Sequence, residues 1–100
     1  MKKVQISSDA LADLNEGFLF YDLQESGLGD YFVTCLKGDI EELKVSAGIH
    51  RIVYGSFHRS LSKTFPYGIF YQFSNDVCIV IAVVDLRRDP AFIRRHLNQL

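Results

Sequence analysis

The sequence has few of the features that mark secreted, metal-binding or membrane-embedded proteins. Its two cysteines, Cys35 and Cys78, lie 43 positions apart in apolar surroundings. They lack the spacing of metal ligands, and such thiols are typical of buried, reduced cysteines in a cytosolic protein. The longest apolar run, Val77–Val84, is eight residues, far below the roughly 20 needed to span a membrane.

The first residues do not predict a secretory signal. Lys2 and Lys3 are followed by VQISSDALADL, which contains no continuous apolar segment. We therefore expect a cytoplasmic protein that does not enter the membrane. Its 100 residues are the length of one domain, and we expect residues 1–100 to fold as a single unit.

Charge is almost balanced over the chain but not along it. The net charge is −1, yet residues 1–50 hold four Lys/Arg and nine Asp/Glu, whereas residues 51–100 hold seven and three. The acidic residues of the first half fall mostly on the polar sides of two predicted helices, which is typical of solvated faces. The basic second half could present a positive surface to an acidic partner.

Apolar spacing predicts an α+β fold. A short strand around Val4 and Ile6 precedes two amphipathic helices, with apolar residues at steps of three and four from Leu11 to Tyr21 and from Leu28 to Ala47. Together the helices are expected to form an αα-hairpin that stops near Gly48.

After Gly48 the period changes to two. Segments 57–64, 67–73 and 77–84 predict a three-strand antiparallel meander whose last strand is buried on both faces. Asp89 is a good N-cap and Pro90 suits the first helical position, so a short C-terminal helix should follow. The expected order is β-α-α-β-β-β-α, with an αα-hairpin packed on a small, mostly antiparallel sheet.

No general catalytic or cofactor motif is present. Gly27-Leu28-Gly29 lacks the spacing of a phosphate-binding loop and does not follow a strand. His50, His58 and His96 are not at metal-ligand spacing. We expect no metal and no cofactor, and the residues alone identify no catalytic group.

Basic residues of the second half are the candidates for binding. Lys63, Arg87 and Arg88 should lie on one rim of the meander, with Tyr67 beside them, because the first and last strands run in the same direction. Such a rim could bind phosphates and stack on a base, or it could form surface salt bridges to Asp85 or Asp89. The full candidate set is Arg59, Lys63, Tyr67, Arg87, Arg88, Arg94 and Arg95.

Three short blocks resemble the ParE/RelE superfamily of type II toxin–antitoxin toxins, and ParE-like plasmid-stabilisation proteins in particular. One block runs from Arg59 through Phe65-Pro66-Tyr67 to Tyr71, the second is Arg87-Arg88-Asp89-Pro90, and the third is the helix start with Ser7, Ala10, Asp13 and Leu14. The resemblance implies a growth-inhibiting toxin that a cognate antitoxin neutralises. ParE-type members poison DNA gyrase, whereas RelE-type members cut mRNA in the ribosomal A site.

The resemblance fits ParE-type action on gyrase best, which requires no catalytic residue. The alternative is a ribosome-dependent endoribonuclease using Arg59, Arg88 and either His58 or His96, since RNA cleavage needs phosphate-binding cations and proton carriers. A third alternative is a degenerate, non-toxic member that still binds antitoxin. Asp85 stands where family members commonly carry histidine, which weakens a proton-transfer role at that position.

The resemblance also implies partners. An acidic, partly disordered antitoxin segment should dock on an apolar groove beside the αα-hairpin or on an exposed sheet edge. Operator DNA is expected only for the toxin–antitoxin complex, and a homodimer is left open. Core packing is the favoured interpretation for each of the candidate docking residues, which are Phe18, Tyr21, Phe32 and Leu36.

Overall fold

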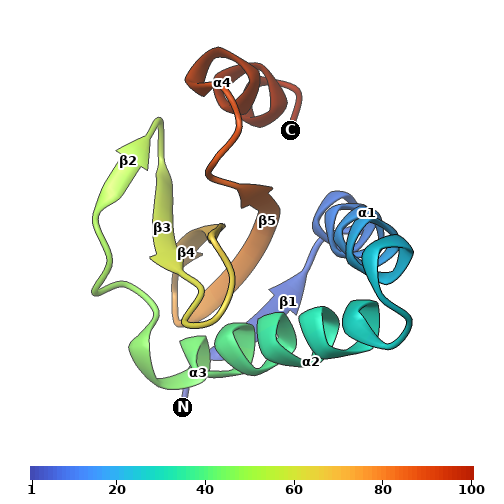
Figure 1. Cartoon of the computed structure of the whole chain (residues 1–100). Coiled ribbons are helices and arrows are strands. Elements are labelled where there is room, and N and C mark those ends of the chain that lie inside the picture. The colour runs from blue at the N-terminus through green and yellow to red at the C-terminus, as the bar shows by residue number, and fades with distance from the viewer.

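The computed structural model describes residues 1–100 and confirms the predicted α+β class (Figure 1). Helix α3 and strand β2 are additions to the predicted order. The elements are β1 (Lys3–Ile6), α1 (Ser8–Gln24), α2 (Leu28–Glu41), α3 (Leu43–Ser46), β2 (Ile52–Tyr54), β3 (Phe57–Leu61), β4 (Tyr67–Ser74), β5 (Val77–Asp85) and α4 (Pro90–Asn98).

The five strands form one sheet in the order β1-β5-β4-β3-β2. Only β1 is parallel to its neighbour, pairing Val4 with Cys78, and the remaining pairs are antiparallel. Strand β5 lies between β1 and β4, which explains its continuous apolar sequence. Strand β2 was not predicted: its three residues, Ile52-Val53-Tyr54, are too few to show alternation, and it forms an edge by pairing with β3.

A side chain caps the start of both α1 and α4, and the cap predicted at Asp89 is confirmed. Ser7 caps α1, with its Oγ accepting from the Ala10 N–H at 3.1 Å. Asp89 caps α4 by accepting from the Ala91 N–H at 2.9 Å, and Pro90 is the first helical residue. The second predicted helix is divided in two after Glu41, and the short α3 that follows lies beside the start of β1, where the Lys2 N–H donates to the Lys44 carbonyl at 3.0 Å.

Each face of the sheet carries a core. Helices α1 and α2 cover one face and bury the larger cluster, which is centred on Phe32 and Tyr71. Helix α4 lies on the other face, where Leu97 packs with Phe70 and Val84. None of the helices combines the length and apolar character needed to cross a membrane.

Candidate functional site

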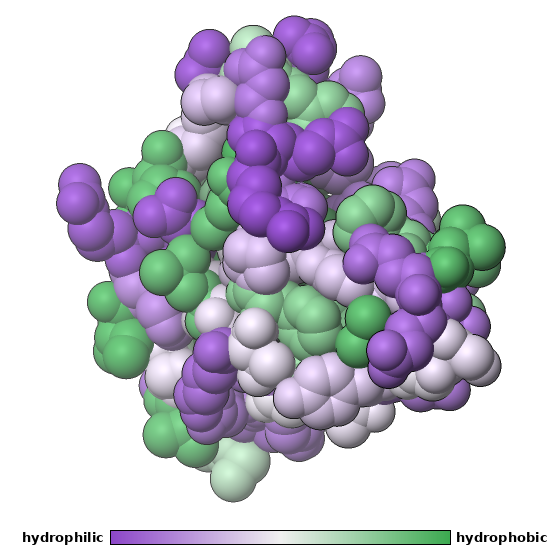
Figure 2. Space-filling view, in the orientation of Figure 1, coloured by the Kyte–Doolittle hydropathy of each residue, from purple (hydrophilic) through white to green (hydrophobic).

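A groove of about 370 Å³ lies between the β2–β3 hairpin and α4. We call it the basic groove, because Arg59, Arg88 and Arg94 line it. Its apolar lining comes from β2, β4, the β5–α4 loop and α4: Val53, Tyr54, Phe70, Leu86, Pro90, Ile93 and Leu97. In Figure 2, strongly hydrophilic side chains gather over α4 and just beneath it.

Arg59 reaches the groove because of its place in the β3 register. It pairs with Phe70, whose side chain lies in the core covered by α4. The next residue, Ser60, pairs with Ile69, which lies in the core covered by α1 and α2. Gly68 makes room for it: a Cβ there would lie 3.2 Å from the Arg59 Cδ and 3.1 Å from a Leu86 methyl. Sequence reasoning missed Gly68, since a glycine inside a strand indicates a close approach without saying of what.

The three arginines of the groove form no salt bridge. The Arg88 guanidinium lies over the ring of Phe92, 3.9 Å from its centroid, a contact that orders the side chain without neutralising its charge, although Phe92 itself does not line the groove. Arg95 is exposed on α4 and also unpaired, but it does not line the groove. The groove therefore offers free positive charge beside apolar surface, a combination that suits an acidic group flanked by apolar ones.

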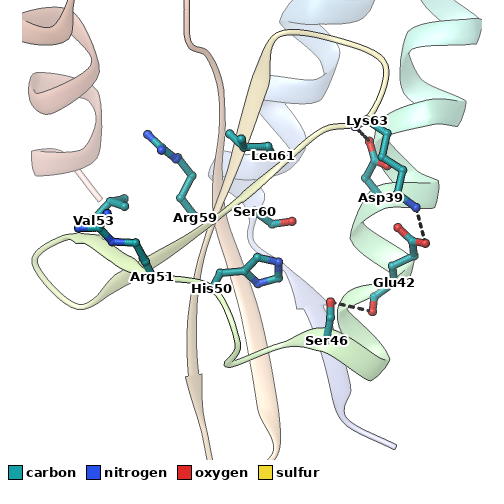
Figure 3. A pocket seen from close by; sticks show the side chains of 10 residues that line it. All are labelled: Asp39, Glu42, Ser46, His50, Arg51, Val53, Arg59, Ser60, Leu61 and Lys63. Carbon is teal, nitrogen blue, oxygen red and sulfur yellow. Dashed lines mark hydrogen bonds and ion pairs between the residues drawn. The ribbon is translucent and has the colours of Figure 1, made fainter.

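Lys63 lies elsewhere, contrary to the expected shared rim. Its Nζ pairs with the Oε1 of Glu42, the residue between α2 and α3, at 2.5 Å, and this contact raises the pKa of the lysine. It lines a separate cavity of about 430 Å³, to which Asp39 and Glu42 contribute on one side and Arg51 and Arg59 on the other; in Figure 3 the two arginine side chains point away from the acidic pair. Arg59 lines both hollows and connects them.

Arg87 and Tyr67 lie at the predicted end of the sheet, where Tyr67 pairs with Asp85, but neither is free for binding. The Arg87 guanidinium pairs with Asp85 at 2.9 Å and donates to the Tyr21 hydroxyl at 3.3 Å. It therefore forms the local salt bridge that was the predicted alternative to phosphate binding. Burial alone would raise the pKa of Asp85, but Arg87 outweighs it and the pKa is lowered. Tyr67 is 7% exposed and packs against Phe32, because its strand face turns toward the helices. Burial raises its pKa strongly.

The four residues of the nuclease hypothesis do not form one cluster. His58 lies on the opposite face of the sheet from Arg59, stacked on Tyr71 with ring centroids 5.0 Å apart. His96 lies in a third cavity of about 400 Å³, between α1 and α4, which it shares with Arg88. No three His, Cys, Asp or Glu side chains are placed to hold a metal ion.

His50 makes the stability of the β2 side pH-dependent. Burial, followed by the charge of His58, lowers the pKa of His50, whose Nδ1 lies 2.6 Å from the Tyr71 hydroxyl. A lowered pKa stabilises the fold above the unfolded value of about 6.5, and this stability is lost as the pH falls. We expect the free energy of unfolding to decrease from pH 7 to pH 5, and His50→Gln to reduce that decrease, as measured by urea denaturation. An equal decrease in the variant would contradict this role.

Comparisons with known proteins agree on the fold. No protein-family model and no curated protein matches the chain. Among solved structures, a chain of the chromosomal ParDE TA system from P. aeruginosa superimposes with a TM-score of 0.78 at 11% identity, covering 85% of this chain and 96% of that one. The isolated E. coli RelE toxin gives 0.62 at 17% identity and full coverage of both chains. The intact E. coli RelBE toxin-antitoxin complex gives 0.61 at 17%, covering 88% and 100%. The chain therefore has the ParE/RelE toxin fold.

Proposed function

We propose that this chain is the toxin of a type II toxin–antitoxin module, that a cognate antitoxin neutralises it, and that DNA gyrase is its target. The observation that carries the proposal is the fold, which superimposes on nearly the whole of a ParDE chain with a TM-score of 0.78. Fold does not choose the target by itself. The choice of gyrase rests on the ParE-like motifs around Arg59 and Arg87-Arg88, and on the separation of His58 from Arg59.

The basic groove is the surface that we assign to the target. Its arginines are unpaired in the free chain, so a carboxylate-bearing partner gains charge-assisted hydrogen bonds without first breaking internal ones. Of the other candidates, Arg94 lines the groove, whereas Arg87 and Lys63 are already paired. We therefore assign the target contact to Arg59, Arg88 and Arg94.

The antitoxin is assigned mainly to other surfaces. Tyr21, Phe32 and Leu36 are buried in the core, so they do not form a docking surface. Phe18 remains half-buried beside a shallow hollow of α1 and α2. The short edge strand β2 exposes Ile52 and offers backbone groups for an added strand. We place the module in the cytoplasm, with operator DNA bound only by the toxin–antitoxin complex.

Purified chain is expected to inhibit gyrase supercoiling of relaxed plasmid and to leave ribosome-bound mRNA intact. Each assay is run with and without the antitoxin expected to be encoded beside the gene, and antitoxin should restore supercoiling. A-site cleavage with unaffected supercoiling would overturn the gyrase assignment. Absence of growth arrest on expression without antitoxin would instead favour a non-toxic antitoxin-binding member.

One observation supports the endoribonuclease alternative. Arg88 lines both the basic groove, with Arg59, and the α1–α4 cavity, with His96. A phosphate held by the arginines would therefore lie between the groove and an imidazole. If cleavage is seen, Arg59→Ala and Arg88→Ala should each reduce it by about 100-fold or more, and unchanged cleavage would remove them from the mechanism.

A further inference from the structure

Asp13 is the one buried charged residue of the protein, at 8% exposure. Its carboxylate lies where α1, β5 and α4 meet. One oxygen accepts from the Val83 N–H at 2.9 Å, and the His96 Nε2 lies 3.0 Å and 3.2 Å from the two oxygens. Asp13 and His96 are 83 positions apart, so the pair connects the first helix to the last.

The contact with Val83 explains why a carboxylate is tolerated here. Strand β1 ends where Ile6 pairs with Val80, and Ser7 makes the last backbone contacts along that edge of β5. Beyond this point the Val83 N–H has no strand beside it, and Asp13 supplies the acceptor. A buried N–H without an acceptor is costly, so the sheet requires an acceptor at this position. The Val83 contact does not, however, require His96.

Helix α4 has few other attachments. Leu97 is its only buried residue, and Ile93 packs partly against the same core. The Tyr54 hydroxyl donates to Asn98 near the end of the helix. Figure 1 shows α4 at one end of the molecule, joined to β5 by a short loop. The pair between His96 and Asp13 is therefore a large part of what fixes α4 in place.

We propose that Asp13 is a positioning residue: through His96 it holds α4 on the sheet and so sets Arg88 and Arg94 opposite Arg59 in the basic groove. We call this link between Asp13 and α4 the tether. Its importance for function rests on the proposed role of the basic groove, but its existence does not depend on that role. Because of the tether, the shape of the basic groove depends on the ion pair that joins His96 of α4 to Asp13 of α1.

The charges around the pair determine its pH dependence. Glu16 faces Asp13 from α1, Asp85 and Tyr67 line the same cavity from β5 and β4, and Arg88 lines it from the loop before α4. Burial raises the pKa of Asp13 more than Val83 and His96 lower it. The ionised carboxylate therefore lowers global stability as the pH rises through that raised pKa, while the same negative charge strengthens the hydrogen bond with His96. The tether should therefore weaken as the pH falls through the raised pKa of Asp13.

Hydrogen exchange on the full chain tests the tether without any target. Asp13→Asn keeps an acceptor for Val83 but removes the charge, and His96→Gln keeps a donor but cannot be protonated. In both variants the protection factors of α4 amides should fall about tenfold, the loss expected for one charge-assisted hydrogen bond. Protection in β4 and β5 should stay unchanged, and the Asp13→Asn thermal midpoint should not fall. Asp9→Asn is the matched control, because it removes the same charge from an exposed position in the first turn of α1 that does not line this cavity, and it should leave α4 unchanged.

A pH series separates positioning from packing. In the wild type, α4 protection should fall as the pH is lowered through protonation of Asp13, whose pKa is raised by burial, and Asp13→Asn should lose this dependence. Unchanged α4 protection in both variants would overturn the tether, as would an equal loss in α4 and β5, which would make Asp13 a support of the whole fold. Failure of gyrase inhibition in the wild type would overturn only the proposed function, because the exchange experiment does not use gyrase.

Discussion

Arg59→Glu should raise the concentration of protein needed for half-maximal inhibition of gyrase supercoiling by about 100-fold. Arg59 is half-buried, free of any salt bridge and lines both hollows beside β3, so a partner carboxylate bound there is substantially desolvated. Losing a charge contact of this kind costs about 2–5 kcal/mol, and placing a like charge opposite adds to the loss. Arg88→Glu should act in the same direction, since Arg88 lines the same groove.

The matched control is Lys37→Glu, which changes the net charge by the same amount on the exposed face of α2. Long-range electrostatic attraction depends on the total charge of the protein. If it alone caused the loss of inhibition, the loss should be equal in both variants and should become smaller at higher salt concentration. Equal losses in Arg59→Glu and Lys37→Glu would contradict a specific role for the groove. Circular dichroism and thermal unfolding should show that both variants are folded.

The parts of the fold that sequence predicted well depend on neighbouring residues. The cap at Asp89 is a contact across two positions, and the apolar steps of α1 correctly place Leu14 and Tyr21 on its buried side. The same pattern was wrong for Leu11, which is half exposed, and for Asp13, which is buried. The site depended on contacts that no local pattern records. Lys63 is drawn to Glu42 across 21 positions, and His96 to Asp13 across 83.

The alternating pattern of β4 could not predict which face of the strand, and with it Tyr67, meets the larger core. It correctly placed Tyr67, Ile69 and Tyr71 on one face, but Gly68 and Phe70 are apolar as well, because β4 is covered on both faces. Alternation then gives no sign of which face meets the larger core. The basic rim was therefore placed with Tyr67 on it, whereas the structure buries Tyr67 and gathers Arg59 and Arg88 on the α4 side.

Gly17→Ala should lower the free energy of unfolding by about 2 kcal/mol, although helix propensity alone favours alanine by about 1 kcal/mol. A Cβ at Gly17 would lie 2.4 Å and 2.5 Å from two ring carbons of Phe32. Phe32 is fully buried, with the rings of Tyr21, Phe65 and Tyr67 at centroid distances of 5.0, 5.0 and 4.9 Å. The ring therefore has no space to retreat, and α1 must move away from α2.

Gly38→Ala is the control that isolates this clash. Gly38 is also inside a helix, α2, but nothing lies within 4 Å of the added Cβ, so the substitution should stabilise the chain by up to about 1 kcal/mol. Urea unfolding of the two variants should therefore shift in opposite directions, and the Gly17→Ala thermal midpoint should fall by roughly 10 °C. If Gly17→Ala were as stabilising as Gly38→Ala, the distance between α1 and α2 would have to be larger than it is in this structure. The packing of the helices, which fixes Asp13 beside β5 and α4, would then need revision.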